Sequence, residues 1–182
     1  PMREYEAVVF DMDGVIFDSE KKVVECWQVL ADKYGFTGIE EACRACLGTT
    51  KEKSKEIMLQ RYGEDFPYET YSAEASKLFH ERYDGGRLPK KTGIEKILQA
   101  LSQEGKKIAL ASSTRRQTVE SQLREAGLFG YFDKIICGDM VGKSKPEPDI
   151  YIRACKELGV LPEQAYAIED SYNGIRSAYR AG

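Results

Sequence analysis

The chain has 182 residues, of which 42% are hydrophobic and 31% charged, and 27 Lys and Arg against 30 Asp and Glu leave a net charge of −3. This balance excludes a collagen-like, low-complexity or disordered acidic chain, and it gives no electrostatic reason to expect nucleic acid as a partner. No apolar run approaches the roughly 20 residues that span a bilayer, and residues 1–6 lack the apolar stretch of a secretory signal. We therefore expect no membrane partner and a cytoplasmic location.

The first predicted elements are a short buried strand and then a helical block. Residues 5–10 form an apolar run that Asp11, Asp13 and Gly14 end abruptly. Continuous apolar character favours a strand of a parallel sheet that is buried on both faces. Residues 17–89 carry apolar side chains at helical spacing and contain no convincing strand. This block is therefore predicted to be a separate domain of about four helices.

From residue 90 the pattern alternates between helices and strands. The predicted strands are 107–111, 134–137 and 165–168, and the predicted helices carry apolar positions within 94–101, 119–126, 150–158 and 175–179. Pro146 and Pro148 are expected to start the third of these helices, since proline is tolerated in a first helical turn. Alternation implies a parallel sheet with helical crossovers. The predicted fold class is therefore α/β, with a core of residues 1–16 and 90–182 into which residues 17–89 are inserted.

The five cysteines and the single histidine are interpreted as ordinary structural side chains. An odd number of cysteines without a secretory signal is typical of reduced thiols. Cys43 and Cys46 form a Cys-x-x-Cys pair, but the sequence has no second pair to complete the four ligands of a structural zinc site. We interpret this pair as packing or half-exposed thiols, and His80 as a surface or packing residue rather than a member of a Ser-His-Asp triad.

Polar side chains follow the predicted strands, at the points where the strands end. They are Asp11 and Asp13 after the first strand, Ser112, Ser113 and Thr114 after the second, Lys145 before the helix that follows the third, and Glu169 and Asp170 after the fourth. Each group alone is also explained as a helix cap, because Asp and Ser are favoured at helix N-termini. In parallel sheets, however, ligands bind at the carboxyl ends of the strands. The four groups together therefore predict one shared site.

This set of side chains suits phosphoryl transfer. Clustered carboxylates repel one another and need a cation, and oxygen ligands suit Mg²⁺, which binds through one or two carboxylates plus substrate phosphate. Hydroxyl and ammonium groups can hold the phosphate oxygens over which charge spreads. The spacing of Asp11 and Asp13 either puts both carboxylates on one side of an extended chain or sends one to phosphorus and the other to the leaving oxygen.

Four segments resemble the motifs of the haloacid dehalogenase superfamily, in the same order and over nearly the whole chain. They are 11–19 (DMDGVIFDS), Ser112 within 110–114 (LASST), Lys145 within 144–149 (SKPEPD) and 169–175 (EDSYNGI). The nearest branch is that of the β-phosphoglucomutase-like phosphatases and mutases. The resemblance implies a Rossmann-like parallel-sheet core with an inserted all-helical cap domain that closes over the site and excludes water.

The resemblance also implies the catalytic residues. Asp11 would be the nucleophile that forms an aspartyl-phosphate. Asp13 would be the general acid and then the base for water. Ser112 and Lys145 would bind and neutralise the transferring phosphoryl group.

Metal and substrate contacts follow from the same resemblance. The implied cofactor is Mg²⁺, held by Asp11, Asp13, Glu169 and Asp170, where Asp13 contributes its backbone carbonyl. The implied substrate-binding residues are Ser113 and Thr114 in the core and Gly48 and Lys51 in the cap. Lys51 falls where the mutases carry an arginine that grips the distal phosphate, and the alternative reading is a solvated lysine at the start of a helix.

Two departures from the mutases favour a phosphatase. The mutases carry a cap histidine where this chain has Val23, and Lys51 lacks the bidentate fork of arginine. We therefore expect a Mg²⁺-dependent phosphatase of a small sugar phosphate or related organophosphate, with β-phosphoglucomutase activity as the alternative. Asp13 argues against a dehalogenase or a phosphonate hydrolase, which lack a carboxylate there. A catalytically idle binding module is disfavoured because Asp11, Asp13 and Lys145 are all present.

The chain ends at residues 180–182, where the family continues into another core strand and a last helix. We expect this missing strand to lie beside the strand that precedes Asp170, so that its absence leaves an uncovered sheet edge that invites association. The expected partner is a small phosphorylated metabolite, and the expected state is a monomer or weak dimer.

Overall fold

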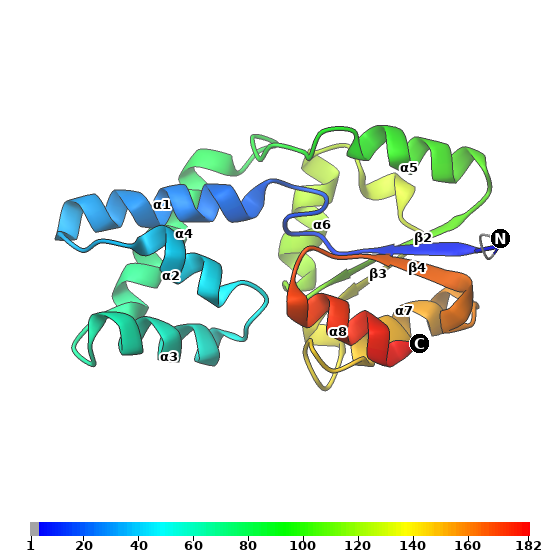
Figure 1. The fold of residues 1–182 in the computed structure, drawn as a ribbon. Coiled ribbons are helices and arrows are strands. Elements are labelled where there is room, and N and C mark those ends of the chain that lie inside the picture. Colours follow the sequence, from blue (N-terminus) through cyan, green and yellow to red (C-terminus); the bar gives the residue numbers. More distant parts are fainter. Residues whose placement is uncertain (1–3) are drawn as a thin grey trace. The chain divides into compact units, whose positions relative to one another are not determined.

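A computed structural model describes residues 4–182 (Figure 1). The chain divides into two compact units. One comprises the described residues up to Asp18 together with Leu88–Gly182, and the other is Ser19–Arg87. The first is an α/β unit and the second is helical. Residues 1–3, which the sequence analysis assigned to the core, lie outside the described residues.

The α/β unit is built on a four-stranded sheet in the order β3–β2–β1–β4. The strands are β1 (Ala7–Phe10), β2 (Lys107–Ser112), β3 (Lys134–Cys137) and β4 (Ala165–Ile168). All three pairs of neighbouring strands are parallel. All four residues of the central strand β1 are buried, as its unbroken apolar run predicts. The parallel sheet confirms the α/β fold class predicted from the sequence.

Helices precede, connect and follow strands β2, β3 and β4 along the chain. They are α5 (Ile94–Gln103), α6 (Arg116–Glu125), α7 (Asp149–Leu158) and α8 (Tyr172–Ala181), with 3₁₀ turns η1 (Phe129–Tyr131), η2 (Gly138–Met140) and η3 (Pro162–Gln164). The apolar face of α7, which includes Tyr151 and Ala154, packs in one core cluster with Val9 and Ala109 of the sheet. Helix α7 is capped by Gly159, whose φ of 72° is the left-handed conformation typical of the residue that follows a helix.

The predicted start of α7 was wrong. The sequence analysis placed Pro146 and Pro148 in its first turn, but the helix begins at Asp149. Residues 144–147 instead form a turn in which the N–H of Glu147 donates to the carbonyl of Ser144 at 3.0 Å. The chain therefore approaches α7 through a turn that carries Lys145, and Pro148 stands just outside the helix as its N-cap.

The helical unit contains four α-helices in the described chain. They are α1 (Ser19–Tyr34), α2 (Ile39–Cys46), α3 (Lys51–Tyr62) and α4 (Tyr68–Tyr83). Its core is rich in aromatic rings, among them Trp27, which stacks on Tyr68 with 6.2 Å between ring centroids. Helix α3 begins at a capped end, since the Thr50 hydroxyl accepts the N–H of Lys53 at 3.2 Å. Within residues 4–182, no helix is both long and apolar enough to cross a bilayer.

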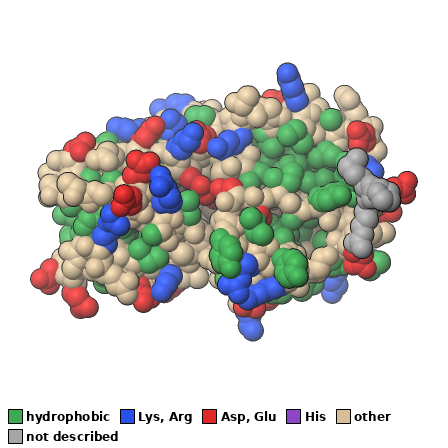
Figure 2. All heavy atoms as spheres, in the orientation of Figure 1, with side chains coloured by type: hydrophobic (Ala, Val, Ile, Leu, Met, Phe, Trp, Pro, Cys, Tyr) green, Lys and Arg blue, Asp and Glu red, His purple; other side chains and the backbone are tan. Residues whose placement is uncertain are grey.

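Strand β4 forms one edge of the sheet and is more exposed than its neighbour β1. Hydrophobic side chains gather on the surface of the α/β unit in Figure 2. The exposed ones on β4 and α8 are Tyr166, Ile168, Tyr172, Ile175 and Tyr179. In the part of the chain that the structure describes, β4 has a partner on one side only.

Candidate active site

The sheet register brings three segments to the same level at the carboxyl ends of the strands. Phe10 of β1 pairs with Leu110 of β2 on one side and with Ile168 of β4 on the other. The next residue along each strand is therefore Asp11, Ala111 or Glu169. In an α/β sheet this carboxyl edge is where ligands bind.

Lys145 connects these segments through a buried ammonium group. Its Nζ donates to Oδ1 of Asp11 at 3.2 Å, to the carbonyl of Ala111 at 3.0 Å, and to Oε1 of Glu169. The side chains of Lys145, Asp11 and Glu169 are only 7%, 13% and 3% exposed. Charges this deeply buried are tolerated in proteins only when they are paired. We call Asp11, Lys145 and Glu169 the buried charge cluster.

The surroundings of Asp11 in the buried charge cluster disfavour its ionised form. Burial raises the pKa of Asp11 to about 8; the Lys145 ammonium opposes this rise, whereas the carboxylates of Glu169 and Asp13 add to it. The ionised form of Asp11 is therefore disfavoured unless more positive charge is supplied. A bound cation would supply it.

Three carboxylates are close enough to share such a cation. Asp11, Glu169 and Asp170 each offer an oxygen, and these oxygens lie within 4.8 Å of one another. Oε2 of Glu169 is buried and has no hydrogen-bond partner among the described residues. A buried carboxylate oxygen without a partner is costly, and an oxygen-only donor set is the kind that Mg²⁺ prefers. The residues present therefore fit the predicted metal.

Asp13 is held by the segment that follows β2. The Thr114 hydroxyl donates to Oδ2 of Asp13 at 3.2 Å, and the N–H of Thr114 donates to Oγ of Ser112 at 3.1 Å. Ser112 is fully buried, whereas Ser113 is exposed. Gly138 packs so closely against this segment that a Cβ there would overlap the carbonyl oxygen of Ser113. Glycine is therefore needed at residue 138 to keep this loop in place.

The two remaining predicted site residues belong to the helical unit. Gly48 lies between α2 and α3 with a φ of 69°, a conformation that favours glycine. Lys51 is the exposed first residue of α3. The part of Gly48 and Lys51 in substrate binding stays a prediction.

Sequence reasoning missed Tyr151 and Gly174. Tyr151 was predicted as part of the apolar face of a helix, yet its hydroxyl donates to Oε1 of Glu169 at 2.5 Å and its ring centroid lies 5.3 Å from Nζ of Lys145. Burial and the neighbouring Glu169 raise the pKa of Tyr151 far above its usual value, so the hydroxyl stays a donor. Gly174 lies in the first turn of α8, where a Cβ would overlap Oε2 of Glu169.

Each missed residue left a weak signal in the sequence. A tyrosine on an apolar helix face carries a hydroxyl that needs a partner once it is buried. A glycine in a first helical turn lowers helix propensity and so indicates close packing. Neither signal identifies Glu169 as the group that is contacted.

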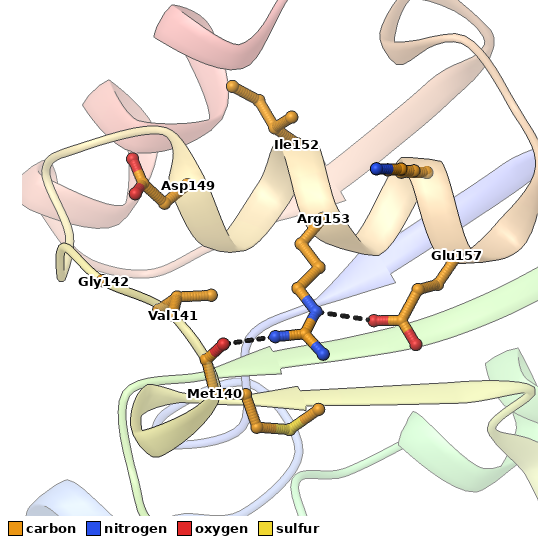
Figure 3. Close-up of a pocket in the computed structure, with 8 residues that line it drawn as sticks. Met140, Val141, Gly142, Asp149, Ile152, Arg153 and Glu157 are labelled. Carbon is orange, nitrogen blue, oxygen red and sulfur yellow. Dashed lines mark hydrogen bonds and ion pairs between the residues drawn. The ribbon is translucent and has the colours of Figure 1, made fainter.

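A hollow in the α/β unit lies between η2 and α7, with a volume of about 650 Å³ (Figure 3). Its lining residues are Met140, Val141, Gly142, Asp149, Ile152, Arg153, Lys156 and Glu157. The Arg153 guanidinium already donates to Glu157 at 2.9 Å and to the carbonyl of Met140. None of the predicted site residues lines this hollow.

The cysteine pair of the helical unit is placed for packing. Cys43 is buried and Cys46 is half-buried. Burial raises the pKa of Cys43 to about 12 and also raises the pKa of Cys46. Because the thiolate is the reactive form, these thiols are poor nucleophiles and metal ligands at neutral pH.

Comparison with known proteins adds four relationships. The profile of the haloacid dehalogenase-like hydrolases matches residues 8–182. The phosphorylated carbohydrates phosphatase of Thermotoga maritima is 32% identical over 182 residues, which cover 97% of this chain and 82% of that protein. The β-phosphoglucomutase of Bacillus subtilis is 32% identical over 185 residues, which cover 97% and 80%. Among solved structures, CbbY from Rhodobacter sphaeroides in complex with phosphate matches with a TM-score of 0.74 at 32% identity, over 97% of this chain and 83% of that one.

Proposed function

Because this chain belongs to the family of haloacid dehalogenase-like hydrolases, we propose that it is a Mg²⁺-dependent phosphatase of small sugar phosphates that works through an aspartyl-phosphate on Asp11. The observation that carries the proposal is the buried charge cluster at the carboxyl edge of the sheet. Similarity to a phosphatase of phosphorylated carbohydrates supports the substrate class.

Asp11 is the proposed nucleophile. One of its carboxylate oxygens attacks phosphorus, and the bond between phosphorus and the leaving oxygen breaks. Lys145, 3.2 Å from Oδ1 of Asp11, holds the carboxylate in place. Its ammonium group would also offset the charge on the phosphoryl oxygens during transfer. Ser112, at the end of β2, is proposed to bind the phosphoryl group together with Lys145.

Asp13 is the proposed acid and base. The hydrogen bond from Thr114 fixes Oδ2 of Asp13 and so orients the carboxyl group. In the first step Asp13 gives its proton to the leaving alkoxide oxygen. In the second step it takes a proton from the water that attacks the phosphorus of the aspartyl-phosphate, which returns Asp11 to its starting state.

The residues that would hold Mg²⁺ are Asp11, Glu169 and Asp170, and the family resemblance adds the backbone carbonyl of Asp13. When bound, the ion supplies positive charge that offsets both the carboxylates and the phosphoryl oxygens. Ser113 and Thr114 are proposed to contact the substrate from the core, and Gly48 and Lys51 from the helical unit.

A second candidate function is β-phosphoglucomutase. Similarity to the Bacillus subtilis mutase, which is also 32% identical, favours it. Val23 and Lys51 support the phosphatase, because the mutases carry a histidine and an arginine at the corresponding positions.

Phosphorus NMR tests both candidates in one experiment. The protein is incubated with Mg²⁺ and a panel of sugar phosphates that includes β-glucose 1-phosphate with a trace of bisphosphate primer. Release of inorganic phosphate is the expected result and ranks the substrates. Appearance of glucose 6-phosphate without phosphate release would establish the mutase. Asp11→Asn serves as the control for a contaminating phosphatase.

A further inference from the structure

The two carboxylate oxygens of Glu169 differ in their hydrogen bonding. Its Oε1 accepts hydrogen bonds from both the Tyr151 hydroxyl and Nζ of Lys145. Its Oε2 accepts none from the described residues, although it is buried. The two oxygens of one carboxylate are therefore in very different states.

Tyr151 is held rigidly enough to impose this difference. It is 3% exposed and lies on the face of α7 that packs in the core with β1 and β2. Its ring also faces the Lys145 ammonium at 5.3 Å. A tyrosine ring fixed by packing places its hydroxyl at a fixed point, because the oxygen lies on the ring axis.

Without the Tyr151 hydroxyl, Glu169 would lose its uncharged hydrogen-bond donor. Lys145 would then be the remaining hydrogen-bond donor to Oε1, and Lys145 also serves Asp11 and the carbonyl of Ala111. The carboxylate could then rotate and offer Lys145 either oxygen. At Gly174, where a Cβ would overlap Oε2, there is no side chain to prevent such a rotation.

We propose that Tyr151 is a positioning residue, which binds Oε1 of Glu169 so that Oε2 stays the oxygen offered to the metal ion. This inference rests on the proposed function, because it assumes that Glu169 is a Mg²⁺ ligand. Partners of metal ligands orient those ligands, and their loss costs about 10- to 100-fold in metal affinity.

The test is the Mg²⁺ dissociation constant of the Tyr151→Phe variant, measured by titration calorimetry on the full chain without substrate. Phenylalanine keeps the ring, its packing and its contact with Lys145, and removes only the hydroxyl. We expect the dissociation constant to rise by about 10- to 100-fold. In the phosphatase assay, the Mg²⁺ concentration for half-maximal rate should rise by a similar factor, while kcat at saturating Mg²⁺ stays unchanged.

The matched control is Tyr166→Phe, because the Tyr166 side chain is 48% exposed on β4. It should bind Mg²⁺ like the unchanged protein. A Tyr151→Phe protein that melts at a lower temperature yet binds Mg²⁺ normally would assign the hydroxyl a purely structural role and overturn the inference. If the unchanged protein hydrolyses sugar phosphates but has the same Mg²⁺ affinity as Tyr151→Phe, the inference about Tyr151 is wrong and the proposed function stands. If the unchanged protein binds no Mg²⁺, the proposed function fails with it.

Discussion

Lys145 in the α/β unit and Lys55 in the helical unit each pair with a carboxylate, in very different surroundings. Nζ of Lys145 lies 3.2 Å from Oδ1 of Asp11, with side chains 7% and 13% exposed. Nζ of Lys55 lies 2.5 Å from Oε1 of Glu69, with side chains 42% and 68% exposed. Of these two pairs the exposed one is the shorter, whereas the other buried pair of Lys145, with Glu169, is shorter still. Burial, rather than distance, separates the charges of the candidate site from those of the surface.

This difference has an electrostatic cause. Water screens an exposed pair, so that holding the two side chains together gains little. In a buried pair each charge has been removed from water and depends on its partner. Buried ion pairs therefore often mark functional sites. At this sheet edge the proposed function is phosphoryl transfer.

The largest expected effect is on activity, from Asp11→Asn. The amide cannot act as the nucleophile, so phosphate release should fall by roughly 10⁴-fold or more. The fold should survive, because the neutral amide is close in size to the carboxyl group and Lys145 stays paired with Glu169. Phosphate release and the melting temperature measure the two effects. Asp32→Asn, at an exposed site on α1, is the control, and activity within tenfold of the unchanged protein in Asp11→Asn would exclude the assigned mechanism.

The next largest effect is on stability, from Lys145→Met. This change leaves Asp11 and Glu169 buried without their cation, which should cost about 3 kcal/mol in the free energy of unfolding at pH 7. Urea denaturation in metal-free buffer measures it.

The loss in Lys145→Met should grow with pH. The pKa of Asp11 is raised to about 8, and removing the ammonium raises it further. A carboxyl group with a raised pKa in the folded state contributes its full stability below its ordinary pKa, and that stability is lost as the pH rises through the raised value. The variant should therefore lose more stability at pH 9.5 than at pH 7. An equal loss at both values would mean that lost packing, not charge, is the cause.

A smaller effect is expected from Gly174→Ala. Alanine gains about 1 kcal/mol over glycine inside a helix, but here its Cβ overlaps Oε2 of Glu169 and must displace that side chain. Stability should therefore change little while Mg²⁺ affinity falls about tenfold or more. Gly130→Ala is the control, since its Cβ would meet no atom within 4 Å. Normal Mg²⁺ affinity in Gly174→Ala would show that Glu169 moves without consequence.

The sequence predicted the sheet because its strands have clear boundaries. Each is a short apolar run that ends at glycine or at polar residues, and in a parallel sheet the end of a strand is also the edge that carries the site. This is why Asp11 and Glu169 could be expected to lie together. The start of α7 was misplaced because a turn formed by residues 144–147 and a first helical turn tolerate the same prolines.

The contacts at the tips of side chains could not be predicted. Helical periodicity shows that Tyr151 faces the core, but it does not show which atom its hydroxyl meets. The contact with Glu169 depends on how α7 packs against the sheet, and the contact of Gly174 depends on how α8 leaves β4. Gly48 and Lys51 remain predictions for a similar reason, since their spacing along the chain does not determine what they contact.

The smallest expected effect is from Lys55→Met, which repeats the Lys145→Met substitution at an exposed site. Lysine and methionine have similar helix propensities, and the hydrogen bond from Lys55 lowers the pKa of Glu69 only in a solvated setting. The melting temperature should therefore stay within about 1 °C of that of the unchanged protein, and 0.5 M salt should not alter this result. A double-mutant cycle with Glu69→Gln isolates the pair itself. A loss of stability comparable to that of Lys145→Met would mean that burial does not distinguish the two pairs. The burial of Lys145, Asp11 and Glu169 would then no longer be an argument for the candidate site.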